Sequence, residues 1–385
     1  MNRIFRFLSL ALLASVAIWS AGLFLDGRGG RFASVQPELF YRRGSEALND
    51  YYMPWKCAHE GYRQETETVG YVAPDGRRLA MDRLDRCYPP FALLPYLALP
   101  CTDAAAAAFT AVCAALFLLA LFRLARREGV PRPAFAVAVL ALTAPFLFTL
   151  ERANPVFLSA AGVACFLADF DSEREDRRTF AAFALAFAAV LKLSPALLGV
   201  LFLRRRDWKS AGIAAGVSAA LFLLPFVCFA DGSFAEWLSH AAEHGREMSG
   251  SAAWGFAPFH RAVAIIRGVD WRAGVAPACL AARLLGFALL AGAVFTRRRD
   301  DAALLAVTGL LLAPGNMLFY AALYLYPVCL MRAPAWNGRR GRLEALAWFA
   351  LFASVQIPFG PLAANRLLAA SAVLALPAFC VRRCR

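Results

Sequence analysis

The chain has 385 residues, of which 60% are hydrophobic and 18% are charged. A soluble domain usually carries about 45–50% apolar and about 25% charged residues, so this composition excludes a disordered chain and argues against a soluble globular protein. The formal charge of +14 would also fit a nucleic-acid-binding protein, but the positions of the charges do not.

Apolar stretches recur along the whole chain and predict an all-α polytopic membrane protein. Several of them reach the ~20 residues that cross ~30 Å of hydrocarbon, and shorter ones are tolerable where protein or water covers their ends. If every stretch crosses, the chain has about 12 transmembrane segments. The stretches are 7–25, 103–122, 134–150, 155–168, 179–191, 195–203, 210–230, 275–296, 302–313, 316–331, 343–359 and 366–381.

Basic residues concentrate in alternate connections between these stretches. The N-terminus, five short connections and the C-terminal tail hold 23 of the 41 Lys and Arg residues but only nine acids, and the remaining charges cancel. This is the positive-inside pattern. It predicts that both termini are cytoplasmic, and it removes the reason to expect a nucleic-acid partner. We expect the first stretch to be a retained helix, with a cleaved signal peptide as the alternative.

Residues 26–102 form the first of two large loops that we expect on the outer side. The loop contains Asn49-Asp50-Tyr51-Tyr52 and ends in Tyr88-Pro89-Pro90, ahead of an apolar segment too short to cross. Proline fits the start of a helix, so this segment should form a short helix at the membrane interface. Asp50 would then lie where lipid headgroups meet water, although a lone Asp in a Tyr-rich loop also fits a turn cap or an arginine partner.

Two cysteines, Cys57 and Cys87, bracket the polar stretch of this loop. The outer side is oxidising in a bacterium, so we expect a disulfide between them, with two unpaired thiols as the alternative. The chain contains no C-x-x-C pair, and zinc bound through thiolates is therefore not expected.

Lys192 interrupts an apolar run, and Pro195 follows it closely. A lysine at the centre of a membrane helix costs about 2.5–3.5 kcal/mol on insertion scales, so such residues are functional candidates. We expect residues 179–203 to form a hairpin of two short helices with Lys192 at its outer tip. There the amine could pair with a lipid phosphate, and a snorkelling anchor is the alternative.

The second large outer loop, residues 231–274, begins with an amphipathic pattern. Glu236, His240 and His244 recur at intervals of four residues and share one helical face. We expect this to be the wet face of a helix that lies on the membrane. The side chains expected to face lipid are Phe234, Trp237, Leu238 and Ala241. Metal binding through the same spacing is the alternative.

The order of these features resembles the GT-C superfamily of polytopic glycosyltransferases, specifically glycosyltransferase family 87. Two motifs depart from the family pattern, since an Ala replaces the Gly of an Arg-Gly-Asn turn and Gly-Asn stands where members often show Ser-Trp. The motifs, in chain order after the acidic and tyrosine-rich first loop, are Tyr88-Pro89-Pro90, Arg152-Ala153-Asn154, Lys192-Leu193-Ser194-Pro195 before Arg204-Arg205-Arg206, and Pro314-Gly315-Asn316 before Tyr320.

The resemblance implies a GT-C-like fold and an inverting transfer reaction. The chain would be one integral membrane domain, 1–385, in the bacterial inner membrane, with interfacial helices in the two periplasmic loops. It would move a mannose- or arabinose-like sugar from a polyprenyl-phosphate donor to a periplasmic glycan or lipid acceptor. Its partners would be membrane lipid, the lipid-linked donor and the acceptor, and we expect neither a metal nor another cofactor.

The resemblance also suggests roles for individual residues. An acid of the first outer loop serves as general base, and Asp50 matches best, followed by Glu38 in Glu38-Leu-Phe-Tyr41. A lipid-phosphate leaving group needs fixed cations, for which Lys192, Arg152 and Arg261 are candidates. The residues that we expect to contact substrate are Tyr51, Tyr52, Tyr88, Asn154, His260, Asn316 and Tyr320.

Two other classes of function compete with a glycosyltransferase. A transporter or lipid flippase would need charged or broken helices near the midplane and repeated halves, whereas the polar residues here gather at one face of the membrane. A non-catalytic subunit of an envelope glycan assembly complex predicts that no outer acid matters for activity.

Overall fold

The structure, a computed structural model, describes most of the chain as helices. The described residues contain one exception, an antiparallel pair of two-residue strands, β1 (Tyr71–Val72) and β2 (Arg78–Leu79). Apart from this pair, the prediction of an all-α fold is confirmed. The residues described are 48–60, 62, 71–72, 78–79, 87–229, 234–247, 275–314, 319–336, 338–353 and 371–380.

The chain divides into two compact units. The Asp50 unit comprises residues 41–120 and 149–248, and the Arg332 unit comprises 1–40, 121–148 and 249–385. Besides the strands, the Asp50 unit contains α2 (Asn49–Glu60), α3 (Pro90–Ala98), most of α4 (Asp103–Arg127), α7 (Val156–Asp169), α8 (Glu175–Leu191), η3 (Ser194–Gly199), α9 (Val200–Arg204), α10 (Trp208–Leu223), η4 (Leu224–Cys228) and α11 (Phe234–Glu247). The Arg332 unit contains α5 (Pro133–Ala141), most of α6 (Ala144–Glu151), α13 (Val275–Phe295), α14 (Arg299–Leu312), η6 (Phe319–Tyr324), α15 (Leu325–Arg332), η7 (Ala333–Ala335), α16 (Gly338–Ala353) and η8 (Leu376–Phe379).

Apolar helices long enough to cross a membrane are present. Among the described residues, α4 and the continuous segment Trp208–Cys228 meet that length, and α5 with α6 would make a third span bent by 58°. The segment Trp208–Cys228 leaves large apolar side chains uncovered, with Val227 87% exposed. A helix that is apolar on all sides and uncovered by protein suits lipid. The prediction of a membrane protein is confirmed, and the number of 12 crossings stays a prediction.

The apolar stretch 134–150 is two helices rather than one. Helix α5 ends at Ala141 and α6 begins at Ala144. Pro145 explains the break, because a proline lacks an N–H and its ring clashes with the carbonyl four residues earlier, here that of Ala141. At the break, the carbonyl of Leu140 accepts from both the N–H and the buried hydroxyl of Thr143, at 3.1 and 2.7 Å.

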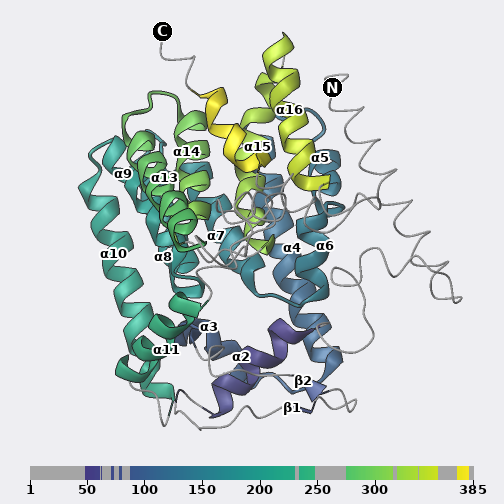
Figure 1. The fold of residues 1–385 in the computed structure, drawn as a ribbon, viewed down its shortest axis with the longest axis vertical. Coiled ribbons are helices and arrows are strands. Elements are labelled where there is room, and N and C mark those ends of the chain that lie inside the picture. Colours follow the sequence, from purple (N-terminus) through teal and green to yellow (C-terminus); the bar gives the residue numbers. More distant parts are fainter. Residues whose placement is uncertain are drawn as a thin grey trace, which may run out of the picture. The chain divides into compact units, whose positions relative to one another are not determined.

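Helices α7, α8 and α10 lie side by side in the Asp50 unit (Figure 1). Small residues let α7 and α8 approach closely, as is common between membrane helices. A Cβ added to Gly162 of α7 would lie 2.8 Å from the carbonyl oxygen of Ala184. The hydroxyl of Ser159 donates across the same contact to the carbonyl of Ala188 at 2.9 Å. Helix α8 of this tight pair also packs against α10, η3 and α3.

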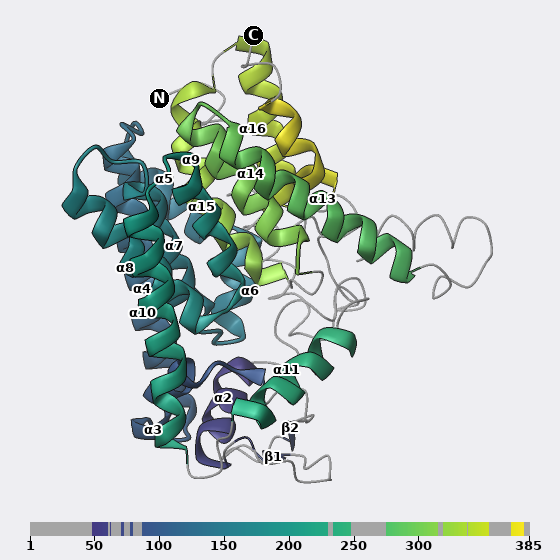
Figure 2. The ribbon, with the colours of Figure 1, turned by 90° about the vertical axis from the view of Figure 1, so that its left-hand side faces the viewer.

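Three short helices, α2, α3 and α11, gather at one end of this unit and form what we call the end layer (Figures 1 and 2). As the sequence predicts, α3 starts with a proline, at Pro90. Aromatic side chains fasten the layer by donating to backbone carbonyls of the segment 87–100. These bonds are Tyr51 to Pro100 (2.8 Å), Trp55 to Leu99 (2.8 Å), Tyr62 to Tyr88 (2.7 Å) and Trp237 to Cys87 (3.2 Å).

The orientation predicted for helix α11 is wrong for Trp237 and His240, whereas Phe234 and Leu238 are exposed, as expected for side chains that face lipid. Trp237 is buried, and its ring packs against Phe222 with centroids 4.8 Å apart. His240 is also buried, and its Nε2 is hydrogen-bonded to the carbonyl of Tyr62 at 2.9 Å. The four-residue spacing correctly predicted a helix in this segment. It does not determine which face of that helix packs against the rest of the protein.

The Arg332 unit contains a buried cluster of charges. Arg332 ends α15 with its side chain 1% exposed. Its guanidinium donates to Asp301, and to both carboxylate oxygens of Glu344, one of them at 3.0 Å. Both acids are buried. The charge pattern predicts that Arg332 lies in a solvated basic connection, and this prediction is wrong. Two buried acids neutralise the Arg332 side chain within the packed helices.

Candidate active site

Asp50 lies in the first turn of α2, and the backbone fixes its position. The N–H groups of Leu48 and Asp50 donate to the carbonyls of Glu151 and Arg152, both at 3.0 Å. The start of α2 is therefore hydrogen-bonded to the turn between α6 and α7. An acid in a first turn is also stabilised by the partial positive charge at the helix N-terminus.

The side chain of Asp50 is held by two residues of the same turn. Arg152 forms a bidentate pair with it, with Nε to Oδ2 and Nη2 to Oδ1 both at 2.9 Å. Asn154 donates Nδ2 to Oδ2 at 2.6 Å, while its Oδ1 accepts from the N–H of Val156 at 2.9 Å and so orients the amide. The Asp50 side chain is only 7% exposed. Such charge-assisted, bidentate bonds are strong and directional, so the carboxylate is held in one orientation.

The residue between these two donors, Ala153, has a left-handed backbone conformation. Its φ is 54°, and its side chain is buried. This conformation brings Cβ close to the following carbonyl and costs roughly 1–2 kcal/mol for an L-residue. Alanine therefore stands here where a glycine would fit without strain.

We expect Ala153→Gly to raise the free energy of unfolding by about 0.5–1 kcal/mol, because glycine adopts positive φ freely. Thermal or denaturant unfolding in detergent would measure the change. Ala108→Gly is the matched control, since Ala108 is exposed within helix α4, and a glycine there should lower stability by about 1 kcal/mol. Two equally destabilising substitutions would contradict the assignment of strain to Ala153.

Tyr51 and Tyr52, expected to contact substrate, are buried beside Asp50. Tyr51 packs against Tyr96 of α3, with centroids 5.4 Å apart, and its hydroxyl is engaged with a backbone carbonyl in the end layer. The hydroxyl of Tyr52 donates to the carboxylate of Asp103 at the start of α4. Both phenols thus have internal partners, and a contact with substrate stays a prediction. Sequence reasoning did not single out Tyr96 or Asp103, although both lie close to the motifs it used.

Lys192 lies where α8 ends. The helix stops at Leu191, Lys192 is extended with φ −146° and ψ 123°, and the 3₁₀ helix η3 follows from Ser194. The predicted break in the apolar run is confirmed. Helix α3 contacts both α2 and α8, and the rings of Phe91 and Phe187 meet at 6.0 Å. One short helix therefore packs against both Asp50's helix and Lys192's helix.

Cys57 and Cys87 lie in the same end layer, and the structure contains both as thiols. Cys57 packs in the same core cluster as Tyr62, and the Tyr62 hydroxyl donates to the carbonyl of Tyr88, the residue that follows Cys87. Burial raises the pKa of this hydroxyl, and negative charge on either cysteine would raise it further. The predicted disulfide stays a prediction. We expect a non-reducing peptide map of protein from the oxidising compartment to recover the two residues in one cross-linked fragment. Separate peptides with alkylated thiols would contradict it.

The other predicted site residues are dispersed. The carbonyl of Tyr88 accepts from Tyr62 in the end layer, whereas Tyr320 belongs to η6 of the Arg332 unit. The predicted residues that lie outside the described part of the chain are Glu38, His260, Arg261 and Asn316.

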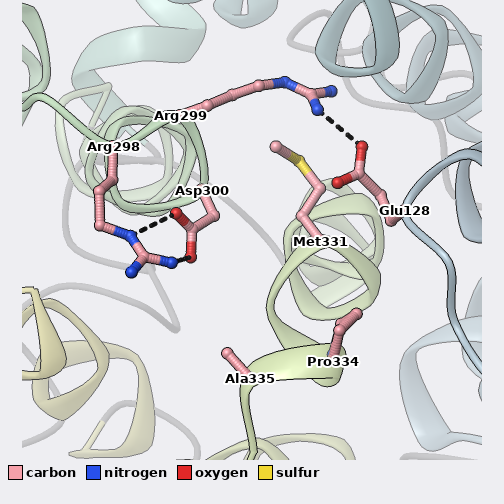
Figure 3. A pocket seen from close by; sticks show the side chains of 7 residues that line it. All are labelled: Glu128, Arg298, Arg299, Asp300, Met331, Pro334 and Ala335. Atoms are coloured by element: carbon pink, nitrogen blue, oxygen red, sulfur yellow. Dashed lines mark hydrogen bonds and ion pairs between the residues drawn. The ribbon is translucent and has the colours of Figure 1, made fainter.

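A polar cavity of about 360 Å³ opens in the Arg332 unit. Figure 3 shows Arg298 turned toward Asp300, while Arg299 reaches Glu128. The remaining lining residues are Met331, Pro334 and Ala335. Two acids balance two arginines here, so the cavity offers no excess positive charge to a phosphate.

Comparison with known proteins identifies one family. The model of glycosyltransferase family 87 matches residues 87–320, which is more than half of the chain. The matched region contains Arg152, Asn154 and Lys192, and it begins after Asp50. No curated protein and no solved structure matches the chain.

Proposed function

Because the chain belongs to glycosyltransferase family 87 and is therefore a glycosyltransferase, we propose that it moves a sugar from a polyprenyl-phosphate donor to a glycan or lipid acceptor. The observation that carries the proposal is the contact of Asp50 with Arg152 and Asn154. It connects an acid outside the matched region with two residues inside it. Membership in a transferase family also favours this reaction over transport.

In the proposed reaction, Asp50 is the general base. The acceptor hydroxyl is a weak nucleophile until a carboxylate takes its proton. As the proton moves to Oδ1 of Asp50, the acceptor oxygen bonds to the anomeric carbon and the bond from that carbon to the phosphate oxygen breaks. The bonding electrons leave with the polyprenyl phosphate, and the sugar is transferred with inversion.

Arg152 and Asn154 position the base in this proposal. Arg152 commits Nε and Nη2 to Asp50, so any direct contact with the donor phosphate would be additional to this role. Oδ2 of Asp50 accepts from both residues, whereas Oδ1 accepts from one. Oδ1 therefore has a lone pair to offer the acceptor hydroxyl. A base fixed in one orientation needs no rearrangement as the reaction proceeds.

Lys192 is the proposed partner of the departing phosphate. A lysine at a helix end within an apolar sequence keeps its ammonium near the headgroup level while its stem lies among apolar groups. As the bond to the sugar breaks, negative charge grows on the lipid phosphate, and a fixed cation stabilises it. Arg261 is the second candidate for this role.

We further propose the arrangement in the membrane. The whole chain, 1–385, would be one integral domain of a bacterial inner membrane with about 12 crossings and cytoplasmic termini. The loops 26–102 and 231–274 would face the periplasm with the reaction site. The distribution of basic residues supports this topology.

The direct test incubates purified protein with radiolabelled polyprenyl-phosphomannose, or the corresponding arabinose donor, and a glycolipid extract of the source membranes. We expect label to pass from the lipid phosphate to the extract without any nucleotide sugar. Retention of all label in both donors, by protein shown to be folded, would overturn the proposed donor class.

Lys192→Ala should weaken use of the donor more than use of the acceptor. We expect the donor KM to rise and kcat to fall, together about 10²-fold in kcat/KM, because the charge acts in both the bound donor and the transition state. Lys209→Ala is the matched control, since Lys209 forms an exposed pair with Glu175. Equal kinetics of the two variants would remove Lys192 from the site.

A further inference from the structure

Helix α13 carries one arginine within an otherwise apolar sequence. Arg283 is the only charged residue of Val275–Phe295. The residue is half-buried, its Nε is buried without a hydrogen-bond partner, and the described part of the chain places no carboxylate in contact with it. A charged side chain in a membrane helix is almost always paired, so the missing partner of Arg283 indicates a binding site for an anion.

The side of α13 that carries Arg283 is open. Leu280, Leu284 and Phe287 recur at intervals of four and three residues, so they share this side of the helix. Their side chains are 57, 61 and 53% exposed. Large apolar side chains exposed together in this way suit contact with lipid chains. A partner of Arg283 therefore has to match both a cation and the apolar surface around it.

The opposite side of α13 is the one built for contact with protein. A Cβ added to Gly286 would lie 2.4 Å from the backbone nitrogen of Ala313, at the end of α14, and Ala282 and Ala293 are buried. Contacts between membrane helices are built on small residues, and α13 uses these against α14. Because α13 contains no acid, a second copy docked symmetrically through the open side would bring two arginines together. The open side therefore favours lipid over a second copy.

The depth of Arg283 suits a lipid phosphate. In the proposed topology α13 begins on the periplasmic side, and Arg283 follows its first residue, Val275, by eight positions, which is about 12 Å along the helix axis. Side chains of a helix tilt toward its N-terminus, so the guanidinium extends toward the outer headgroups while its stem stays among apolar groups. A guanidinium matches a phosphodiester in charge and in bidentate geometry.

We propose that Arg283 and the open side of α13 bind an anionic phospholipid of the outer leaflet. Its phosphate would lie against the guanidinium and an acyl chain along Leu280, Leu284 and Phe287. We assign the surface to a lipid of the bilayer and not to the sugar donor, because a reacting donor has to be enclosed and held against its acceptor. This inference rests on the proposed arrangement in the membrane and is independent of the sugar-transfer reaction.

The test titrates phosphatidylglycerol into the purified full-length protein in mild detergent and counts bound lipid by native mass spectrometry. Arg283→Gln removes the charge but keeps a good helix former, and it should weaken the tightest lipid about 10-fold or more, because a charge-assisted pair is lost. Arg283→Lys keeps the charge without the bidentate geometry and should fall between the two. Phosphatidylglycerol should also raise the apparent Tm of the wild type more than that of Arg283→Gln.

Arg174→Gln is the matched control, since Arg174 is 65% exposed and paired with Asp176, and it should bind phosphatidylglycerol as the wild type does. Equal affinity of the wild type and Arg283→Gln would overturn the site. Displacement of phosphatidylglycerol by a lower concentration of polyprenyl phosphate would assign the surface to the donor, and loss of a dimer in Arg283→Gln would assign it to a protein contact. Either result overturns the proposal. A folded protein that binds this lipid but transfers no sugar would refute the proposed function alone.

Discussion

Asp50→Asn is expected to lower the rate of sugar transfer about 10²–10⁴-fold, the usual cost of losing a general base. The substitution keeps the size of the side chain and an oxygen that can accept from Arg152, but it removes the group that takes the proton. The donor KM should change much less than kcat, because no donor contact is assigned to this carboxylate. Steady-state transfer rates, expressed per folded protein, would measure the effect.

Two further variants separate a base from a structural ion pair. Asn154→Ala removes one hydrogen bond from Asp50 but leaves the carboxylate, so its rate should fall about 10-fold or less. If Asp50 were only an arginine partner, activity in both variants would follow the loss of folded protein, with kcat of the remainder intact. Glu38→Gln distinguishes the second candidate acid: a dead Glu38 variant beside an active Asp50 variant would move the base to Glu38.

Arg332→Met is expected to lower the free energy of unfolding by about 3–5 kcal/mol. It leaves the buried Glu344 without its cation, and it leaves the buried Asp301 with only the guanidinium of Arg298, 3.7 Å away. The methionine replaces most of the apolar stem, so the loss comes mainly from the charge. Denaturant unfolding in detergent would measure it.

The matched control for this variant is Arg174→Met, since Arg174 pairs with Asp176 at the surface and its side chain is 65% exposed. Exposed pairs contribute little, so its stability should change by less than about 1 kcal/mol. Replacing Arg332, Asp301 and Glu344 together by apolar residues should recover much of the loss. Stability of Arg332→Met close to that of the wild type would show that the acids are not left charged and unpaired.

Local features of this fold could be predicted from the sequence. The end of α8 before Lys192 and the start of α3 at Pro90 both follow from a proline beside an apolar run, and the structure confirms them. The break between α5 and α6 had the same signal in Pro145, but the continuous hydropathy of the stretch concealed it.

Contacts between distant segments could not be predicted in the same way. Asp50, Arg152 and Asn154 were each singled out, but no spacing rule says that the start of α2 meets the α6–α7 turn. Arg332 was assigned to a solvated basic connection for the same reason. Its burial depends on acids that are distant in sequence, Asp301 of α14 and Glu344 of α16, and no local pattern indicates them.

The separation between Asp50 and its partners also has a consequence for biosynthesis. Asp50 and Arg152 are 102 positions apart, and a ribosome adding about 5–20 residues per second needs roughly 5–20 s to cover that distance. During this interval α2 has been made but the turn that receives it has not, so the contact between Asp50 and Arg152 cannot form before that turn has been synthesised. Until then the Asp50 carboxylate lacks the Arg152 and Asn154 donors that hold it in the folded protein. The end layer also contains α11, which ends at Glu247, so this layer can be complete only after about two thirds of the chain has been made.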